Sequence, residues 1–324
     1  METQLQHCAD PRVSVPAAAI SECVQPRRAG GLGAWLELVR PPNLFTVPGD
    51  ILVGAALAGV ATQSVLPLLA AVVVSLLLYS SGLILNDFAD RHADARERPG
   101  RPIPSGRVDA TDACAVAVAF MGAAIILSVL TGVTRFWVIA AILSGLILLY
   151  DGPARKIPAV GFIVMGLCRG CNVLLGASIV GSPVSVPVLA GAGMETLYIL
   201  CVSLLAHGEV DKSPASWKWG LPAAAIVGAG PIMLLSLHTA RLTTMVPLVI
   251  LVAWLAATLI ALGPRAGRTP KRIAVLIRGL VLLQILLILF ALWQNPAWFN
   301  QAAIGILIFM FLVAEGLAGR FHGS

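Results

Sequence analysis

Runs of apolar residues, each close to 20 residues long, recur along the whole 324-residue chain and are separated by short polar breaks. An α-helix of about 20 residues spans the roughly 30 Å hydrocarbon core of a bilayer, because each residue advances the helix by about 1.5 Å. Apolar residues make up 58% of the chain and charged residues only 12%, which is too much apolar surface for one soluble core. The sequence therefore predicts an all-α fold, a polytopic helical bundle in a membrane.

Ten apolar segments are expected to be membrane helices, namely 44–61, 66–86, 112–130, 136–150, 159–179, 186–206, 219–237, 243–262, 272–293 and 299–317. The bundle would have about nine transmembrane helices, or ten if the last segment is a supernumerary helix. Residues 31–41 combine apolar and charged side chains, which predicts an interfacial helix. Residues 1–30 contain no long apolar run, so we expect a disordered cytoplasmic tail followed by one transmembrane domain over 31–320.

The basic residues fall almost entirely on one side of the predicted bundle. Of the 22 lysines and arginines, only Arg135 and Arg241 fall in the breaks on the opposite side. Cytoplasmic loops are enriched in Lys and Arg, so the N-terminus and the charged loops are predicted to face the cytoplasm from the inner or cell membrane. Because the basic residues are spread over short loops and form no single stripe, nucleic acid is not an expected partner.

The second apolar segment ends in a cluster of acidic residues. Asp87, Asp90 and Asp94 follow one another at spacings that place all three on one face of a continuing helix. Like charges repel, so we interpret the cluster as a site for Mg²⁺, a hard cation that prefers oxygen ligands and commonly bridges carboxylates to substrate phosphates. The alternative is a solvated helix end whose carboxylates pair with nearby arginines such as Arg91.

A long, charged loop follows this cluster. Residues 96–107 contain three prolines and two glycines, which preclude a helix and favour a shaped loop that folds back over the carboxylates. Its arginines, Arg101 among them, suit a phosphate group because a guanidinium can bind it through two parallel hydrogen bonds. A basic loop that only sets membrane topology is the alternative.

Two polar residues lie deep within the fifth apolar segment. Arg169 falls near its middle, and Asn172 follows one turn later on the same helix face. A guanidinium at the bilayer centre costs at least ~2.5 kcal/mol, so Arg169 requires a partner or a polar cavity. We expect either a substrate group or a structural ion pair with Glu195, which lies at a similar depth in the sixth segment.

Five stretches of the chain form a recognisable combination of motifs. In chain order they are Arg40-Pro41-Pro42-Asn43-Leu44, then Asn86-Asp87-x-x-Asp90-x-x-x-Asp94, then Arg101-Pro102-Ile103-Pro104-Ser105-Gly106-Arg107, then Leu149-Tyr150-Asp151 with Lys156, and finally Gly166-Leu167-Cys168-Arg169-Gly170-Cys171-Asn172 continuing to Gly176. Together they resemble the UbiA superfamily of membrane prenyltransferases, most closely its EboC-like branch. The likeness covers about residues 31–320.

The resemblance implies a bundle around a central, lipid-accessible cavity. An isoprenyl diphosphate would be bound there through Mg²⁺, and its isoprenyl group would pass to an aromatic or other lipophilic acceptor. The resemblance assigns the metal to Asp87, Asp90 and Asp94, and catalysis to these three residues with Lys156. It implies substrate contacts for Asn43, Asn86, Arg91, Arg101, Tyr150, Asp151, Arg169 and Asn172.

The second acidic motif of the superfamily, which follows the sixth span, differs in this chain. Glu209 and Asp211 stand there only two residues apart, and on a regular helix they would point about 200° away from each other. They are expected to bind a second Mg²⁺ if this segment is not helical.

Two other functions are compatible with parts of the sequence. A transporter or non-catalytic binder of a prenylated or lipophilic metabolite would use Arg169, Asn172 and Glu195 to line a pathway, although no internal repeat is visible. A CDP-alcohol phosphotransferase is suggested by the stretch from Asp151 to Arg155, but the acidic residues that should follow are missing.

Overall fold

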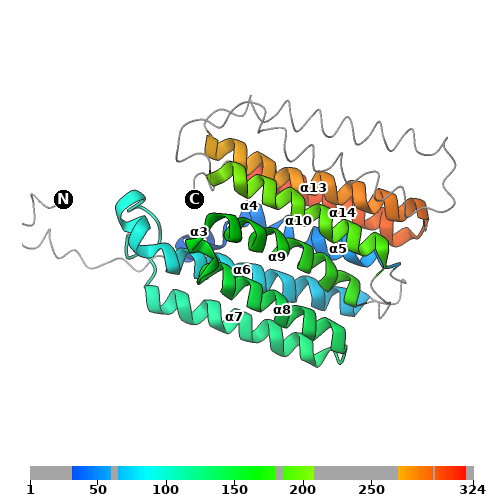
Figure 1. The fold of residues 1–324 in the computed structure, drawn as a ribbon, viewed down its shortest axis with the longest axis horizontal. Helices are drawn as coiled ribbons and strands as arrows, with labels where there is room; N and C mark the ends of the chain where they lie inside the picture. The colour runs from blue at the N-terminus through cyan, green and yellow to red at the C-terminus, as the bar shows by residue number, and fades with distance from the viewer. Residues whose placement is uncertain (1–30, 60–64, 180–184, 208–268, 295, 319–324) are drawn as a thin grey trace, which may run out of the picture.

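The chain folds into a bundle of long helices that run nearly parallel to one another (Figure 1). The computed structural model describes residues 31–59, 65–179, 185–207, 269–294 and 296–318, and this part of the chain contains no strand. Seven of its helices are long and apolar enough to cross a membrane, which confirms the expected all-α membrane bundle. The helices are α3 (Leu32–Val39), α4 (Pro41–Leu44), α5 (Val47–Leu57), α6 (Val65–Glu97), α7 (Ala110–Leu130), α8 (Thr134–Asp151), the 3-10 helix η1 (Ala154–Lys156), α9 (Pro158–Ser178), α10 (Val186–His207), α13 (Thr269–Gln294) and α14 (Trp298–Ala318).

Most expected segments appear with nearly the expected bounds. The helix expected at 66–86 continues as far as Glu97 in α6, so the acidic cluster lies on a regular helix. The other expected spans that form long helices are α7 to α10, α13 and α14. The segments expected at 219–237 and 243–262 lie outside the described residues, as does the tail over 1–30.

The first expected span is shorter than predicted. The chain forms no single helix over 44–61, but the short helix α4, a turn, and the 11-residue helix α5. Pro48 accounts for the break, because it has no N–H to donate to the carbonyl of Leu44. At about 1.5 Å per residue, α5 is only about 16 Å long and does not cross a bilayer core by itself.

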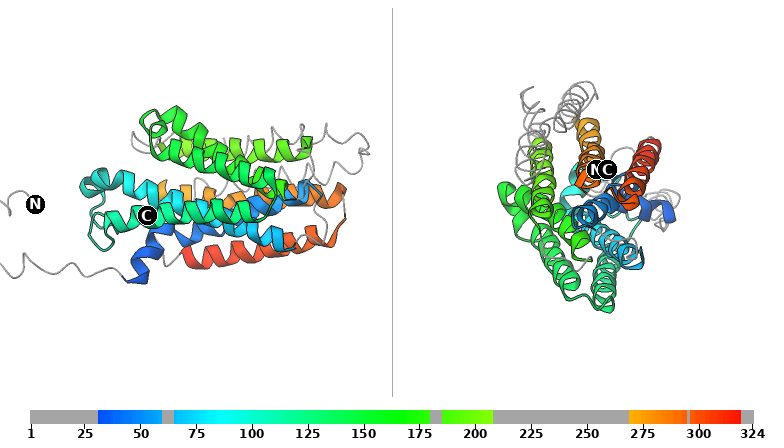
Figure 2. Two further views of the ribbon diagram at one scale, coloured as in Figure 1. Left: turned by 90° about the horizontal axis from the view of Figure 1, so that it is seen from below. Right: turned by 90° about the vertical axis from the view of Figure 1, so that its right-hand side faces the viewer.

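Helix α5 lies in the interior of the bundle, surrounded by longer helices (Figure 2), and each of its residues is buried. Two glycines let α9 approach it closely. A Cβ atom on Gly54 would collide with the carbonyl of Val173, and one on Gly176 would collide with the backbone of Ile51. Small residues commonly allow such contacts between membrane helices. The side chains of α5 therefore project into the protein core.

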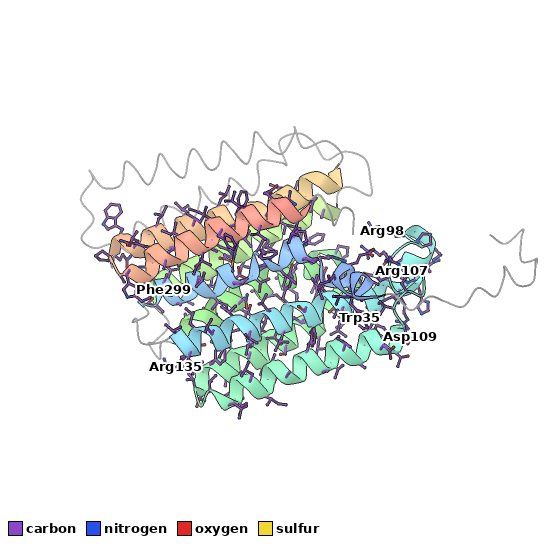
Figure 3. The ribbon with its side chains drawn as sticks, turned by 180° about the vertical axis from the view of Figure 1, so that it is seen from behind. Trp35, Arg98, Arg107, Asp109, Arg135 and Phe299 are labelled. Atoms are coloured by element: carbon purple, nitrogen blue, oxygen red, sulfur yellow. The ribbon has the colours of Figure 1, made fainter. Side chains whose placement is uncertain are left out.

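The two ends of the bundle differ in chemistry. Arg98, Arg107 and Asp109 lie with Trp35 at one end, and Arg135 lies at the other end with Phe299 (Figure 3). We call the first end the loop end, because it carries the connection between α6 and α7. Helix α3 packs there through the fully buried Leu38, while Leu32 remains exposed, and its position at a membrane interface stays a prediction.

Helices α10 and α13 are joined by a hydrogen bond in the apolar core, in which the Tyr198 hydroxyl donates to the Leu276 carbonyl at 2.6 Å. We expect Tyr198→Phe to lower the free energy of unfolding by about 1 kcal/mol, because the phenyl ring still fills the space while the bond is lost. Unfolding in mixed detergent micelles would measure this change. An unchanged unfolding midpoint would show that the bond adds nothing to stability.

Candidate active site

Two carboxylates near the end of α6 face the same cation. The Asp87 and Asp94 side chains are buried, with 4% and 6% of their residue surface exposed. Arg101 Nη1 lies 3.4 Å from Asp87 Oδ1 and 2.7 Å from Asp94 Oδ2. Arg40 Nη2 donates a hydrogen bond to the same Asp87 oxygen at 2.7 Å. The cluster is therefore enclosed at the loop end of the bundle and is not spread into solvent, and half-buried Asp90 lies on the same helix end.

A solvated helix end would pair Asp87 and Asp94 with nearby arginines such as Arg91, and this pairing is not found among the described residues. Arg91 donates to the carbonyl of Phe88 at 2.8 Å, and its guanidinium lies 4.2 Å from the centroid of the Phe88 ring. Arg101 instead reaches back from the loop after α6, and Arg40 comes from the junction of α3 and α4. Arg40 adopts a left-handed backbone conformation there, with φ of 47°.

The loop between α6 and α7 folds back over this end of α6. Backbone hydrogen bonds from Ser105 to Arg101 and from Val108 to Pro102 give the loop its shape. Ile103 and Val108 are buried against α3 and α6. Because the loop has its own hydrogen bonds and its own apolar anchor, it holds Arg101 over the carboxylates.

A cavity of about 140 Å³ lies in the bundle between α6, α8 and α9, and its lining begins at Asn86, the residue before Asp87. Its mouth is polar: Asn86 Nδ2 donates to Asp151 Oδ1 at 3.3 Å. Its walls are mostly apolar or aromatic, and its inner end, which we call the floor, is polar again. The lining residues are Ser75, Leu78, Tyr79, Gly82, Leu83, Asn86, Leu143, Ile147, Tyr150, Asp151, Met165, Cys168, Arg169 and Asn172.

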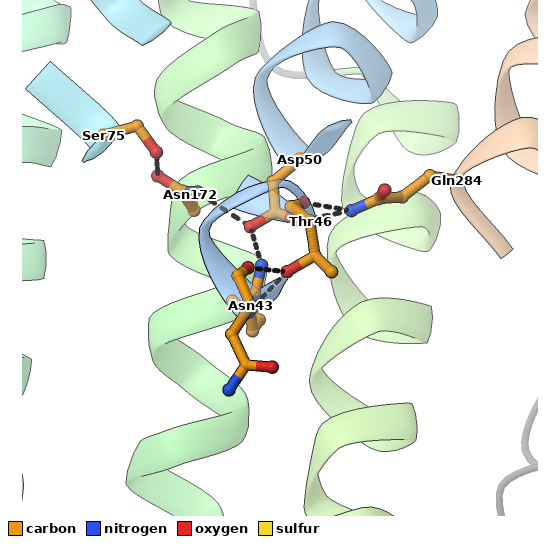
Figure 4. Close-up of polar contacts among 7 residues, drawn as sticks. Asn43, Thr46, Asp50, Ser75, Asn172 and Gln284 are labelled. Carbon is orange, nitrogen blue, oxygen red and sulfur yellow. Dashed lines mark hydrogen bonds and ion pairs between the residues drawn. The ribbon is translucent and has the colours of Figure 1, made fainter. Parts of the chain in front are cut away.

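The floor is held in place by Asp50 of α5, a residue that the sequence reading missed (Figure 4). Arg169 Nη1 and Asn172 Nδ2 both donate to Asp50 Oδ2, at 2.8 and 2.7 Å. Arg169 Nη2 donates to the hydroxyl of Thr46 at 2.8 Å, and Gln284 Nε2 donates to Asp50 Oδ1 at 2.6 Å. An aspartate inside an apolar segment is itself a signal of function or pairing, and it would have pointed to this site.

The ion pair expected between Arg169 and Glu195 is therefore wrong, because Asp50 takes the place of Glu195. Glu195 is fully buried, and neither of its carboxylate oxygens has a hydrogen-bond partner among the described residues. Both α5 and α10 pack closely on α9, where a Cβ atom on Gly170 would collide with the Ala192 carbonyl of α10. The difference therefore lies in which carboxylate reaches the Arg169 guanidinium, and Asp50 does so at 2.8 Å.

The other predicted site residues fall into three groups. Tyr150 and Asp151 line the cavity, as a substrate contact requires. Asn43 contributes its backbone carbonyl to Thr46, while its side chain points away from Asp50 (Figure 4). Lys156 is exposed on η1, and Glu209 and Asp211 lie outside the described residues.

The residues at the loop end fit a divalent cation bound together with a phosphate group. Among the described residues, no three acidic, His or Cys side chains are grouped closely enough to hold a metal alone. Asp87 and Asp94 nevertheless converge on one positive group, Arg101, which stands where a cation would stand. Mg²⁺ is typically bound by one or two carboxylates, with substrate phosphate and water completing its ligands. This donor set therefore suits Mg²⁺ carried with a diphosphate.

Comparison with known proteins identifies the family. The model of the UbiA prenyltransferase family matches residues 50–318. A digeranylgeranylglyceryl phosphate synthase of Natronomonas pharaonis is 32% identical over 157 residues, which are 48% of this chain and 55% of that protein. The same enzyme of Methanoculleus marisnigri is 30% identical over 194 residues, 59% of this chain and 68% of that protein. The chain thus spans about half the length of the first of these relatives.

Solved structures share the fold at low sequence identity. A structure from work on digeranylgeranylglyceryl phosphate synthase in membranes has a TM-score of 0.57 at 18% identity and covers 81% of this chain and 99% of its own. A UbiA homologue from Archaeoglobus fulgidus bound to GPP and Mg²⁺ has a TM-score of 0.54 at 16% identity, with 84% and 99% covered. These matches do not address the EboC-like branch, which stays a prediction. The resemblance seen in the motifs is confirmed at the level of the family, and the chain belongs to the UbiA prenyltransferase family.

Proposed function

We propose that this protein is a Mg²⁺-dependent intramembrane prenyltransferase that moves an isoprenyl group from an isoprenyl diphosphate to a lipophilic acceptor. The observation that carries the proposal is that two buried carboxylates, Asp87 and Asp94, face one cation, and that Asn86, directly before Asp87, lines a mostly apolar cavity. The diphosphate would lie at the mouth and the hydrocarbon in the cavity. The Mg²⁺ and geranyl diphosphate (GPP) named for the A. fulgidus homologue support the same assignment.

Asp87 and Asp94 would hold the Mg²⁺ together with the diphosphate, and Asp90 on the same helix end stays the third predicted ligand. When bound, the metal supplies positive charge that stabilises the departing diphosphate. Arg40 and Arg101 would add hydrogen bonds to the diphosphate oxygens, because the Nε atom of each is buried and has no acceptor among the described residues. The folded loop excludes water, which protects the allylic cation from hydrolysis.

The reaction breaks the allylic carbon–oxygen bond, and both electrons of that bond leave with the diphosphate. The rings of Tyr79 and Tyr150 line the cavity and present π electrons that stabilise a nearby cation. An electron pair of the acceptor then forms the new bond to the allylic carbon, and the proton that the acceptor loses leaves with the diphosphate.

The size of the cavity bears on the donor. At about 140 Å³, it is close to the 150 Å³ cavity that accommodates benzene, so it encloses roughly the first isoprene unit of a donor. The rest of a longer chain would extend towards the lipid. An acceptor built on glyceryl phosphate is favoured over an aromatic ring by the names of the matched relatives.

Several assignments made from the sequence and the family resemblance stay predictions. They are a cytoplasmic loop end, a cytoplasmic tail over 1–30 before the domain over 31–320, a role of Lys156 in catalysis, a substrate contact for Asn43 and Arg91, and a second Mg²⁺ on Glu209 and Asp211.

The test is turnover by the full chain in lipid nanodiscs. The protein would be supplied with Mg²⁺, with labelled dimethylallyl, geranyl, farnesyl or geranylgeranyl diphosphate, and with glyceryl phosphate lipids or aromatic acceptors in separate reactions. We expect pyrophosphate release that requires Mg²⁺ and an extractable prenylated product. Binding of the donor without any release would contradict an enzyme and favour a carrier of lipophilic metabolites.

The contact of Arg101 with both carboxylates makes a prediction about metal binding. Arg101 and a divalent ion compete for the same oxygens, so Arg101→Ala should bind Mn²⁺, as a spectroscopic substitute for Mg²⁺, about tenfold more tightly when no diphosphate is present. Pyrophosphate, in contrast, should bind more weakly to this variant. Mn²⁺ titration followed by electron paramagnetic resonance would measure the first effect.

The matched control for this variant is Arg98→Ala, which removes an exposed arginine of the same loop region. Arg98→Ala should change neither the Mn²⁺ affinity nor the pyrophosphate affinity, because no described carboxylate binds the Arg98 side chain. Equal Mn²⁺ affinities in wild type and Arg101→Ala would show that the arginine does not occupy the metal position.

A further inference from the structure

The floor of the cavity carries a full positive charge. The Arg169 guanidinium lines the cavity and lies over Tyr79, 5.1 Å from the centroid of that ring. Tyr79 stands two helical turns before Asn86 on α6, so this charge lies about 10 Å along the helix from the mouth. An uncompensated guanidinium at that distance would repel an allylic cation formed at the mouth.

Asp50 offsets this charge from behind the floor. It is completely buried, so water does not screen its interaction with Arg169. It is also the shared acceptor of the floor, because its Oδ2 atom binds both Arg169 and Asn172. The two cavity-lining side chains therefore depend on one carboxylate that does not itself line the cavity.

A second buried carboxyl, Glu195, lies within electrostatic range of both Asp50 and Arg169. Because Glu195 can change its own protonation when the charge of Asp50 changes, the comparison is made in a Glu195→Gln background. In that background, removing the charge of Asp50 makes the floor more positive by one unit.

We propose that Asp50 is a positioning residue of the transfer reaction: it cancels the charge of Arg169 and fixes Arg169 and Asn172 at the floor, so that the cavity does not repel the allylic cation. This inference rests on the prenyl transfer proposed above. It gives Arg169 a role other than the direct substrate contact that the family resemblance implies. Arg169 Nη1 and Nη2 each donate to a partner on α5 or its N-terminal turn, and these partners lie away from the mouth.

The decisive variant is Asp50→Asn in the Glu195→Gln background, which removes the charge of Asp50 and keeps its shape. The amide oxygen can accept from Arg169 and Asn172. The amide nitrogen replaces Oδ1, which now accepts from Gln284 Nε2, and it can donate to Gln284 Oε1 once the Gln284 amide turns over. One unit of charge about 10 Å away, at an effective dielectric constant of about 20, corresponds to a roughly 10- to 20-fold loss in kcat. Binding of an inert thiolodiphosphate analogue of the donor should be unchanged, because the diphosphate lies at the mouth.

Two further variants separate charge from structure. The double variant Asp50→Asn with Arg169→Gln makes the floor neutral again and should recover most of the lost kcat. Gln284→Met removes a hydrogen bond to Asp50 but leaves both charges, so its kcat should stay within about threefold of wild type.

Three results would overturn the inference. An unchanged kcat in Asp50→Asn would show that the floor charge does not influence ionisation. An equal loss in Gln284→Met would assign Asp50 a purely structural role. Weaker binding of the analogue by the double variant would show that Arg169 contacts the diphosphate. If wild type itself gives no turnover, the proposed transferase function fails, and the role of Asp50 in it fails too.

Discussion

Asp87→Asn is expected to lower the rate of prenyl transfer by about a thousandfold or more while the protein stays folded. The substitution keeps the shape of the side chain but removes the negative charge that faces Arg40 and Arg101 at the loop end of the bundle. The site would then hold Mg²⁺ poorly, and the departing diphosphate would lose several kcal/mol of charge stabilisation. Release of labelled pyrophosphate under single-turnover conditions measures the loss directly.

Asp112→Asn is the matched control for this variant. Asp112 is an exposed carboxylate in the first turn of α7, outside the carboxylate cluster and the cavity, so its removal should leave turnover unchanged. Undiminished pyrophosphate release by Asp87→Asn would exclude this carboxylate from the reaction. A similar loss in both variants would point to a general effect of surface charge.

The sequence was informative where one element determines the arrangement. The spacing of Asp87, Asp90 and Asp94 predicts one helix face, and α6 indeed continues as a helix to Glu97. The prolines and glycines before Arg107 predict a shaped loop, and the loop does fold back over the end of α6. Both features depend on local backbone preferences, which the sequence carries directly.

The sequence was not informative where several helices have to meet. The length of the apolar run over 44–61 predicted a full span, whereas Pro48 divides it and α5 becomes a short central helix. The partner of Arg169 follows from that packing. Equal depth in the membrane made Glu195 a reasonable partner, but depth alone does not say which side chain of a neighbouring helix reaches the guanidinium. Gly54 and Gly176, which bring α5 against α9, make Asp50 the partner instead.

Asp50→Ala is expected to lower the free energy of unfolding by about 3 to 5 kcal/mol, the largest stability effect of any change considered for this chain. The variant leaves the Arg169 guanidinium buried with its hydroxyl partner Thr46 but without its carboxylate. It also leaves Asn172 and Gln284 without an acceptor that each now uses. Unfolding by increasing sodium dodecyl sulfate in mixed micelles, followed by tryptophan fluorescence, would measure the change.

A matched pair of variants tests whether burial causes this loss. Glu37→Ala breaks the ion pair with Arg107 at the loop end, where the two side chains are 33% and 38% exposed, so it should cost at most about 1 kcal/mol. Asp50→Leu combined with Arg169→Met removes both buried charges and should be more stable than Asp50→Ala, because no charge is left unpaired. If Asp50→Ala costs no more than Glu37→Ala, the Asp50 network does not hold the bundle together, and the close packing of α5 on α9 must do so alone.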